Sequence, residues 1–176
     1  MGWRPDMVEY DRHYWILDET AEARSLLDLG CYEGTLVKKF GAGAKGVEIC
    51  LEAVKFDKER GLNVVSGNAT TYKDPEKFDA VVACELIEHV PSPEQLVKNM
   101  LSLVSPRGWC YITTPNGCYD PVNTLKSWNN NEDLIDHVRT YDAKKVAKLM
   151  KGLEYKLVEN EKELWFKFKT PLDKDE

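Results

Sequence analysis

The sequence predicts an α/β protein with a doubly wound, mostly parallel seven-stranded sheet whose last strand is antiparallel. Five short apolar runs alternate with segments of helical character, which is typical of a parallel sheet covered by helices. Two later segments alternate apolar and polar residues around a short polar link, which favours an antiparallel pair. The length of 176 residues predicts a single domain, which we place at 1–170, with a disordered tail at 171–176.

The predicted strands are runs of apolar residues bounded by glycine, proline or polar residues. Residues 77–84 are apolar almost without interruption, as in a strand buried on both faces of a parallel sheet. Residues 163–169 alternate instead, as in a strand with two unlike faces. The expected strands are 25–29, 44–49, 62–66, 77–84, 109–114, 154–159 and 163–169.

The predicted helices are recognised by their ends and their apolar stripes. Ser92 and Pro93 are the N-cap and first-turn residues of a helix whose stripe reaches about Val104. Asp142 caps a later helix, which Gly152 ends. The expected helices are 10–17, 35–40, 51–60, 93–104 and 143–150, with a turn at 106–108.

Composition and charge limit the class of protein. The net charge is −6 and no basic stripe is present, so a long nucleic-acid partner is not expected. No apolar run approaches the ~20 residues of a membrane span, and the N-terminus lacks a signal-peptide pattern. The five cysteines are scattered without a Cys-x-x-Cys pair, which favours a reducing cytoplasm over a zinc site or disulfides. We expect a cytoplasmic monomer or homodimer without membrane contact.

Two glycines four residues apart, Gly30 and Gly34, follow the first strand and precede a helix. Lacking a Cβ, they let the backbone turn sharply and let a ligand approach it. The spacing does not fit the dinucleotide fingerprint, and Tyr32 would crowd a pyrophosphate. A tight strand-to-helix turn without a function would have much the same pattern.

The segment Asp28-Leu29-Gly30-Cys31-Tyr32-Glu33-Gly34 resembles the first motif of class I S-adenosylmethionine-dependent methyltransferases, commonly Asp-Leu-Gly-Cys-Gly-x-Gly. Here Tyr32 replaces the middle glycine. The order of motifs over residues 10–168 is similar to that of the group of ubiquinone-biosynthesis O-methyltransferases, methyltransferase types 11 and 23. The resemblance implies a Rossmann-like fold, an enzyme, and S-adenosylmethionine as cofactor. The expected cofactor-binding residues are Tyr14, Asp28, Gly30, Cys31, Tyr32, Gly34, Glu48, Ile49, Asn68, Ala69, Glu85 and Leu86.

The expected role of each cofactor-binding residue follows from its position in the sequence and from the resemblance to the family. Glu48 ends the second strand eighteen residues after Gly30, the spacing at which a carboxylate meets ribose hydroxyls in such folds. In the family the turn after the third strand binds adenine, which implies that role for Asn68 and for the N–H of Ala69. In the segment before the first strand, Tyr14, and with it Arg12, is implied to contact the cofactor or to roof its pocket; simple packing of this segment is the alternative.

The segment Glu85-Leu86-Ile87-Glu88-His89 has three possible interpretations. In the first, Glu85 borders the cofactor, Glu88 is structural and His89 faces the acceptor as a general base. The catalytic candidates of this segment are His89 and Glu88. Alternatively, Glu85, Glu88, His89 and His137 bind a divalent metal, as the similarity to small-RNA 2′-O-methyltransferases implies. In the third interpretation the segment is structural. The same sequence also occurs among small-molecule methyltransferases.

The leading functional prediction is in-line methyl transfer to an oxygen, nitrogen or carbon atom of a small molecule, with no metal. The alternatives are a metal-dependent RNA 2′-O-methyltransferase and a non-catalytic S-adenosylmethionine-binding protein. The polar connection 118–140 follows the fifth strand, where α/β sheets bind ligands, so we expect it to form a lid or substrate wall.

Overall fold

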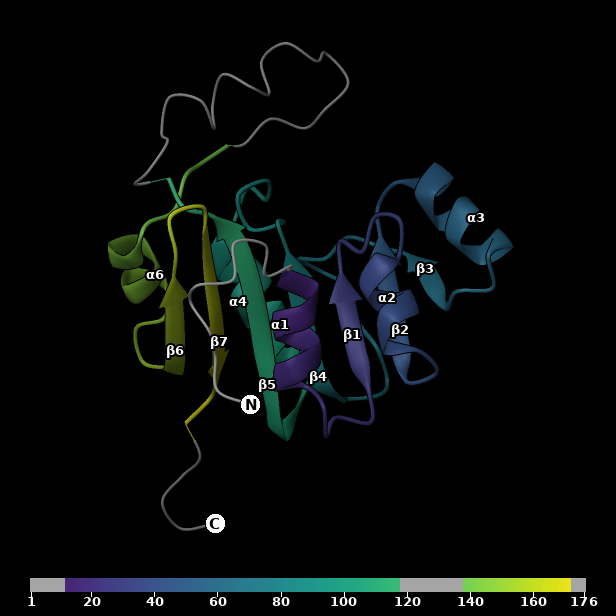
Figure 1. The fold of residues 1–176 in the computed structure, drawn as a ribbon, viewed down its shortest axis with the longest axis horizontal. Coiled ribbons are helices and arrows are strands. Elements are labelled where there is room, and N and C mark those ends of the chain that lie inside the picture. Colours follow the sequence, from purple (N-terminus) through teal and green to yellow (C-terminus); the bar gives the residue numbers. More distant parts are fainter. Residues whose placement is uncertain (1–11, 118–137, 172–176) are drawn as a thin grey trace.

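The computed structural model describes residues 12–117 and 138–171 (Figure 1). Its seven-stranded sheet has the order β3-β2-β1-β4-β5-β7-β6. The first five strands run parallel, and β7 is antiparallel to both β5 and β6. The predicted fold class is therefore confirmed. The elements are α1 (Arg12–Glu19), β1 (Leu26–Leu29), α2 (Thr35–Phe40), β2 (Ala44–Glu48), α3 (Leu51–Glu59), β3 (Val64–Ser66), β4 (Phe78–Cys84), α4 (Pro93–Leu103), β5 (Val104–Pro115), α6 (Ala143–Leu149), β6 (Glu154–Glu159) and β7 (Glu163–Lys169).

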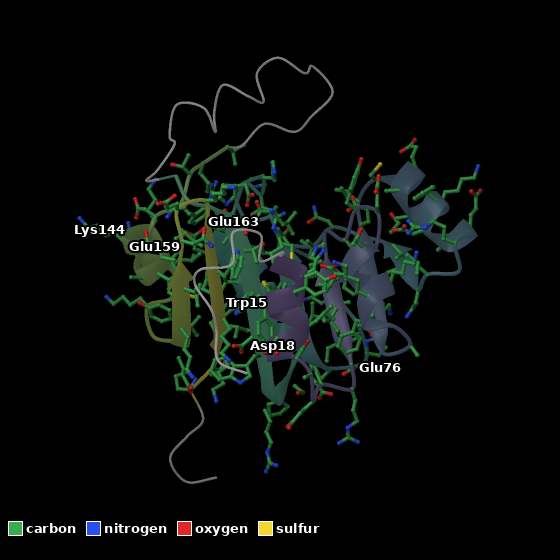
Figure 2. The ribbon with its side chains drawn as sticks, in the orientation of Figure 1. Trp15, Asp18, Glu76, Lys144, Glu159 and Glu163 are labelled. Atoms are coloured by element: carbon green, nitrogen blue, oxygen red, sulfur yellow. The ribbon has the colours of Figure 1, made fainter. Side chains whose placement is uncertain are left out.

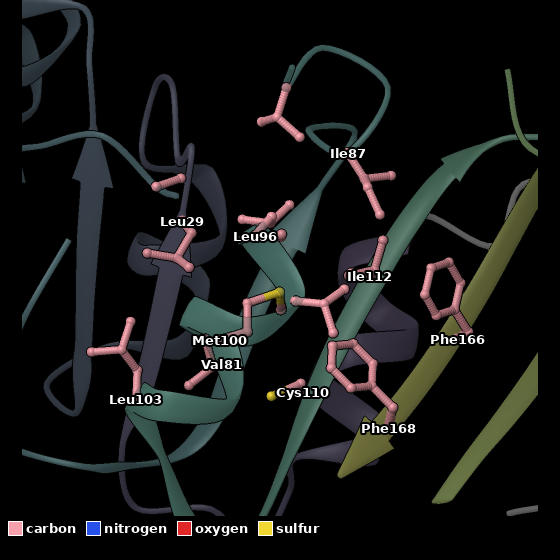
Figure 3. Packing of buried hydrophobic residues seen from close by; sticks show 14 of the residues in the cluster. Leu29, Val81, Ile87, Leu96, Met100, Leu103, Cys110, Ile112, Phe166 and Phe168 are labelled. Atoms are coloured by element: carbon pink, nitrogen blue, oxygen red, sulfur yellow. The ribbon is translucent and has the colours of Figure 1, made fainter. Parts of the chain in front are cut away.

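Helices cover both faces of the sheet, with α1 on the near side and α4 on the far side of the view in Figure 1. One buried cluster joins Trp15 of α1, Val37 of α2 and Val54 of α3 to the sheet. The other joins Met100 of α4 and Val146 of α6 to the opposite face. Figure 3 shows this second cluster, where side chains of α4 pack against those of β4, β5 and β7. Both faces of the central strands are thus buried, which explains their continuous apolar runs.

The start of β5 differs from the prediction. α4 ends at Leu103 and β5 begins at Val104, so the predicted turn at 106–108 lies inside the strand. There the pairing register between β4 and β5 shifts, because β5 carries extra residues between Val104 and Trp109. A bulge of this kind admits proline and glycine while the strand continues. The other predicted boundaries are within one or two residues of those observed.

Aromatic packing and an ion pair fix α1 on the sheet. The ring of Trp15 stacks on that of Trp165 at 5.6 Å and meets Tyr111 edge-on at 5.8 Å. Arg12 donates to Glu163 Oε1, at 3.2 Å from Nε and 2.5 Å from Nη2. Figure 2 labels Trp15, which belongs to α1, and Glu163 near the upper end of β7. The start of α1 is therefore held at the edge of the sheet where the parallel strands end.

No helix within residues 12–117 and 138–171 has both the length and the apolar character needed to cross a bilayer.

Candidate active site

The carboxyl ends of β1 and β4 lie side by side where the strand order reverses, the position at which open α/β sheets bind ligands. In the turn after β1, Gly30, Tyr32 and Gly34 have φ angles of 76°, 46° and 61°. A Cβ on Gly30 would lie 3.0 Å from Cδ1 of Leu86. A Cβ on Gly34 would lie 2.7 Å from a carbon of Leu62. Both glycines are therefore required, and the turn after β4 packs directly on the turn after β1.

The carboxylate of Glu48 binds three backbone amides. Oε1 accepts from the N–H groups of Ile49 and Cys50, both at 2.8 Å, and Oε2 accepts from that of Tyr32 at 2.9 Å. The residue is only 7% exposed. A carboxylate has about four acceptor positions, so this arrangement leaves room for one further donor on Oε2. Glu48 therefore joins the turn after β1 to the start of α3 and keeps one acceptor position open.

Asp28 is buried beneath the same turn. It is 3% exposed, and its Oδ1 has no hydrogen-bond partner within the described residues. Burial, and to a lesser degree the negative charge of Glu48, raise the pKa of Asp28 to about 7. A buried oxygen without a partner next to this turn is suited to a donor from a ligand.

The side chains around Glu48 divide into buried and exposed ones. Ile49 is 61% exposed and Tyr32 is 64% exposed, so both present apolar surface next to the carboxylate. Cys31 is buried, and its Sγ would lie 2.6 Å from a Cβ on Gly46. Burial raises the pKa of its thiol. Cys31 therefore packs into the core, and only its backbone belongs to the turn.

The turn after β3 is closed by its own side chains. Asn68 Oδ1 accepts from the backbone N–H of Thr70 at 2.9 Å and from its hydroxyl at 2.7 Å. Both acceptor positions of this oxygen are thus used, which leaves the side-chain NH₂ for a ligand acceptor. Ala69 is 9% exposed, and its carbonyl accepts from the side chain of Asn99 at 2.8 Å.

The role of Asn99 in this turn was not predicted from the sequence, because the residue lies in the middle of the apolar stripe of a helix. Its Nδ2 also donates to the carbonyl of Tyr72 at 3.1 Å. One buried side-chain amide of α4 therefore binds the turn after β3 at both Ala69 and Tyr72. We predict that Asn99→Ala lowers the free energy of unfolding by about 2 kcal/mol, because one buried and one partly buried carbonyl lose their donor. Urea denaturation checks this. The exposed neighbour substitution Lys98→Ala is the control and is expected to stay within about 0.5 kcal/mol of wild type.

The two candidates from α1 lie in different places. Tyr14 is 59% exposed, and Lys39 lies 4.4 Å above the centre of its ring. Lys39 is near the C-terminal end of α2, and the contact of Tyr14 with the cofactor stays a prediction. Arg12 does reach the site, because its Nε lies 3.9 Å from Glu85 Oε1.

Residues 85–89 form a turn rather than a helix, closed by the N–H of His89 donating to the carbonyl of Leu86 at 2.9 Å. Thr113 Oγ1 donates to Glu85 Oε1, and Thr114 Oγ1 donates to Glu88 Oε2, both at 3.0 Å. Consecutive strand residues face opposite sides of a sheet, so the two glutamates are bound on opposite sides of β5. The common face that helical spacing would create is not formed.

Both glutamates of this turn are deprived of water. Burial is the largest cause that raises the pKa of Glu85 to about 7, against the attraction of Arg12. Burial and the charge of Glu85 raise the pKa of Glu88 to about 8. Glu88 is 1% exposed, and its Oε1 has no hydrogen-bond partner in the described part of the chain. A carboxylate with such a pKa can take up a proton near neutral pH.

His89, the alternative metal ligand His137 and the 118–140 connection were also predicted to belong to the site. His89 is half-buried at the end of the turn. His137 lies outside the described residues, and those described contain no group of three or more side chains suited to hold a metal ion. Most of the 118–140 connection also lies outside them. Its described end contacts the turn, since the N–H of Val138 donates to the carbonyl of Glu88 at 3.0 Å.

Comparison with known proteins decides the family. The family model for a methyltransferase domain matches residues 10–160. This chain belongs to that methyltransferase domain family. The methyltransferase resemblance of the first motif is thereby confirmed at the level of the family.

Individual relatives agree with the assignment to the methyltransferase family. Ubiquinone biosynthesis O-methyltransferase from Paraburkholderia phytofirmans is 32% identical over 104 residues, which are 53% of this chain and 45% of that protein. The matched region is thus about half the length of this relative. The YcgJ protein of Bacillus subtilis has a TM-score of 0.72 at 16% identity, covering 91% of this chain and 99% of that one. The N-methyltransferase NodS of Bradyrhizobium japonicum, solved with S-adenosyl-L-homocysteine, has a TM-score of 0.68 at 16% identity, covering 97% and 92%.

Proposed function

We propose that this methyltransferase domain transfers a methyl group from S-adenosylmethionine to a small-molecule acceptor. The observation that carries the proposal is the carboxylate of Glu48, which is buried at the end of β2, bound by three amides and left with one open acceptor position. Family membership supports the same activity. In this proposal the open position of Glu48 accepts a ribose hydroxyl, a bond worth about 1.5–3 kcal/mol.

The residues around Glu48 fit the rest of the cofactor. Gly30 allows close approach of the ligand to the backbone, and the unpaired oxygen of Asp28 suits a cationic or N–H donor group. Ile49 presents apolar surface for the adenine ring, and the NH₂ of Asn68 suits a ring nitrogen. When bound, S-adenosylmethionine supplies a methyl group already activated by a sulfonium. The protein's task is therefore to place an acceptor in line with it.

We place the acceptor above the ends of β4 and β5, next to the turn 85–89. An acceptor hydroxyl or ammonium must give up a proton as its oxygen or nitrogen bonds to the methyl carbon. His89 would receive it, and Glu88, which holds a proton below its pKa of about 8, would do so only in its ionised form. The contact between Val138 and Glu88 supports the 118–140 connection as the wall of this acceptor pocket.

We also infer a cytoplasmic location. All four cysteines within the described residues, Cys31, Cys50, Cys84 and Cys110, are free thiols, as a reducing compartment favours. Whether the protein is a monomer or a homodimer, and the single domain over 1–170 with its tail, stay predictions.

Isothermal calorimetry with S-adenosylhomocysteine tests the proposed function. We expect one molecule to bind per chain. Gly30→Val is expected to abolish binding, because φ is 76° and a Cβ would already touch Leu86. Gly61→Ala is the control, since Gly61 also has positive φ at 77° but a Cβ there meets nothing within 4 Å. Absence of binding to wild-type protein would overturn the proposal.

A further inference from the structure

Two residues other than glycine have positive φ within the described residues, Tyr32 at 46° and Glu85 at 47°. They follow β1 and β4, which are neighbouring parallel strands at the point where the strand order reverses. Left-handed backbone conformations are costly for residues with a Cβ and cluster at sites of function. The strain is therefore concentrated at the proposed cofactor site.

The structure explains the conformation of Glu85 but not the side chain of Tyr32. Glu85 binds Thr113 through both its side chain and its N–H, each at 3.0 Å, and lies close to Arg12. Tyr32 uses its N–H to bind Glu48, a bond that glycine would make equally well and without strain. The side chain of Tyr32 is 64% exposed. The fold thus needs the backbone conformation at this position, whereas no packing contact within residues 12–117 and 138–171 requires an aromatic ring.

The backbone of Tyr32 is nevertheless bound to the proposed anchor of the ligand, Glu48. Tyr32 and Ile49 donate their N–H groups to the two oxygens of one carboxylate, that of Glu48. Both side chains are more than half exposed. The backbones of two residues with largely exposed side chains are therefore bound to the carboxylate on which a nucleoside would bind. Aromatic rings and apolar chains on either side of a polar anchor are a common arrangement in small-molecule sites.

We propose that Tyr32 is a cofactor-retaining residue, whose ring covers the nucleoside part of the ligand held by Glu48. The inference rests on the proposed function and deepens it. Tyr32 keeps a strained backbone because the ring adds apolar contact that glycine cannot supply. It follows that substitutions here have opposite effects on folding and on binding.

Three variants separate the ring from the strain: Tyr32→Gly, Tyr32→Ala and Tyr32→Phe. Calorimetry with S-adenosylhomocysteine and thermal unfolding without ligand are measured for each. Tyr32→Gly and Tyr32→Ala both lose the ring, so each is expected to weaken binding about tenfold. Tyr32→Gly alone relieves the strain, so its Tm is expected about 2–4 °C above that of Tyr32→Ala. Tyr32→Phe keeps the ring and is expected to bind within about twofold of wild type.

The outcomes are distinct. If wild type binds and Tyr32→Gly binds equally well, the ring has no role and the inference is wrong, while the proposed function stands. If Tyr32→Phe loses as much affinity as Tyr32→Ala, the hydroxyl rather than the ring contacts the ligand, and the inference is again wrong. If wild type itself does not bind, the proposed function fails first. Tyr155→Ala, a change at an exposed tyrosine of β6, is the control and is expected to leave affinity unchanged.

Discussion

Replacing Glu48 with alanine is expected to weaken S-adenosylhomocysteine binding at least about 100-fold and to lower the free energy of unfolding by about 3 kcal/mol. Both effects have one cause. The carboxylate is the shared acceptor of the N–H groups of Tyr32, Ile49 and Cys50. Without it the turn after β1 and the start of α3 lose their common anchor, and the ligand loses the hydroxyl acceptor that we propose for it. Calorimetry and urea denaturation measure the two effects.

A conservative variant refines this expectation. Glu48→Gln keeps the shape but replaces one acceptor oxygen with a donor, so we expect intermediate losses in both measurements. Glu59→Ala, the control, removes an exposed carboxylate from α3, the helix that follows Glu48. It is expected to change the free energies of binding and of unfolding by no more than about 0.5 kcal/mol each. Ligand binding by Glu48→Ala within threefold of wild type would contradict the role of this residue.

The wild-type protein is expected to be less stable at pH 9 than at pH 5, and Glu88→Gln is expected to remove about 3 kcal/mol of that difference. Burial, and then the charge of Glu85, raise the pKa of Glu88 in the folded state to about 8. In the unfolded chain the pKa is ordinary, at about 4.3. Between these values the folded state holds a proton that the unfolded state releases. The contribution of Glu88 to the free energy of unfolding is therefore fully present below about pH 4 and is lost as the pH rises to 8.

Urea denaturation at pH 5, 7 and 9 measures this pH dependence. Asp28 and Glu85 also have raised pKa values, both about 7, and contribute in the same direction, so Glu88→Gln retains part of the slope. Glu76→Gln, which changes an exposed glutamate, is the control and should keep the full wild-type slope. An unchanged slope in Glu88→Gln would show that Glu88 is charged in the folded protein.

The sequence predicted well what local patterns encode. The continuous apolar run of β4 and the alternation in β7 predicted a parallel sheet with an antiparallel last strand. The glycines at 30 and 34 predicted a tight turn that the φ angles now explain. The turn predicted at 106–108 was wrong, because proline and glycine residues accompany a bulge as readily as a chain reversal.

The partners of the site residues could not be predicted in the same way. Thr114 lies 26 residues after Glu88, and Asn99 lies 30 residues after Ala69. Such pairs meet only because parallel strands and the helix between them bring distant segments to one edge of the sheet. The exposure of Tyr14 has the same origin, since a helix side chain can face the sheet or the solvent with little change in local pattern.

By itself the sequence determined the class of fold, the family to which the domain belongs and the acidic residue that ends β2. Only the tertiary structure decided that Glu48 is bound by amides of two segments, that Glu88 loses contact with water and that a tyrosine occupies a left-handed turn position. The physical reason is that strand and turn preferences act between neighbours in the chain. Burial and hydrogen bonding of a carboxylate depend on every segment packed around it.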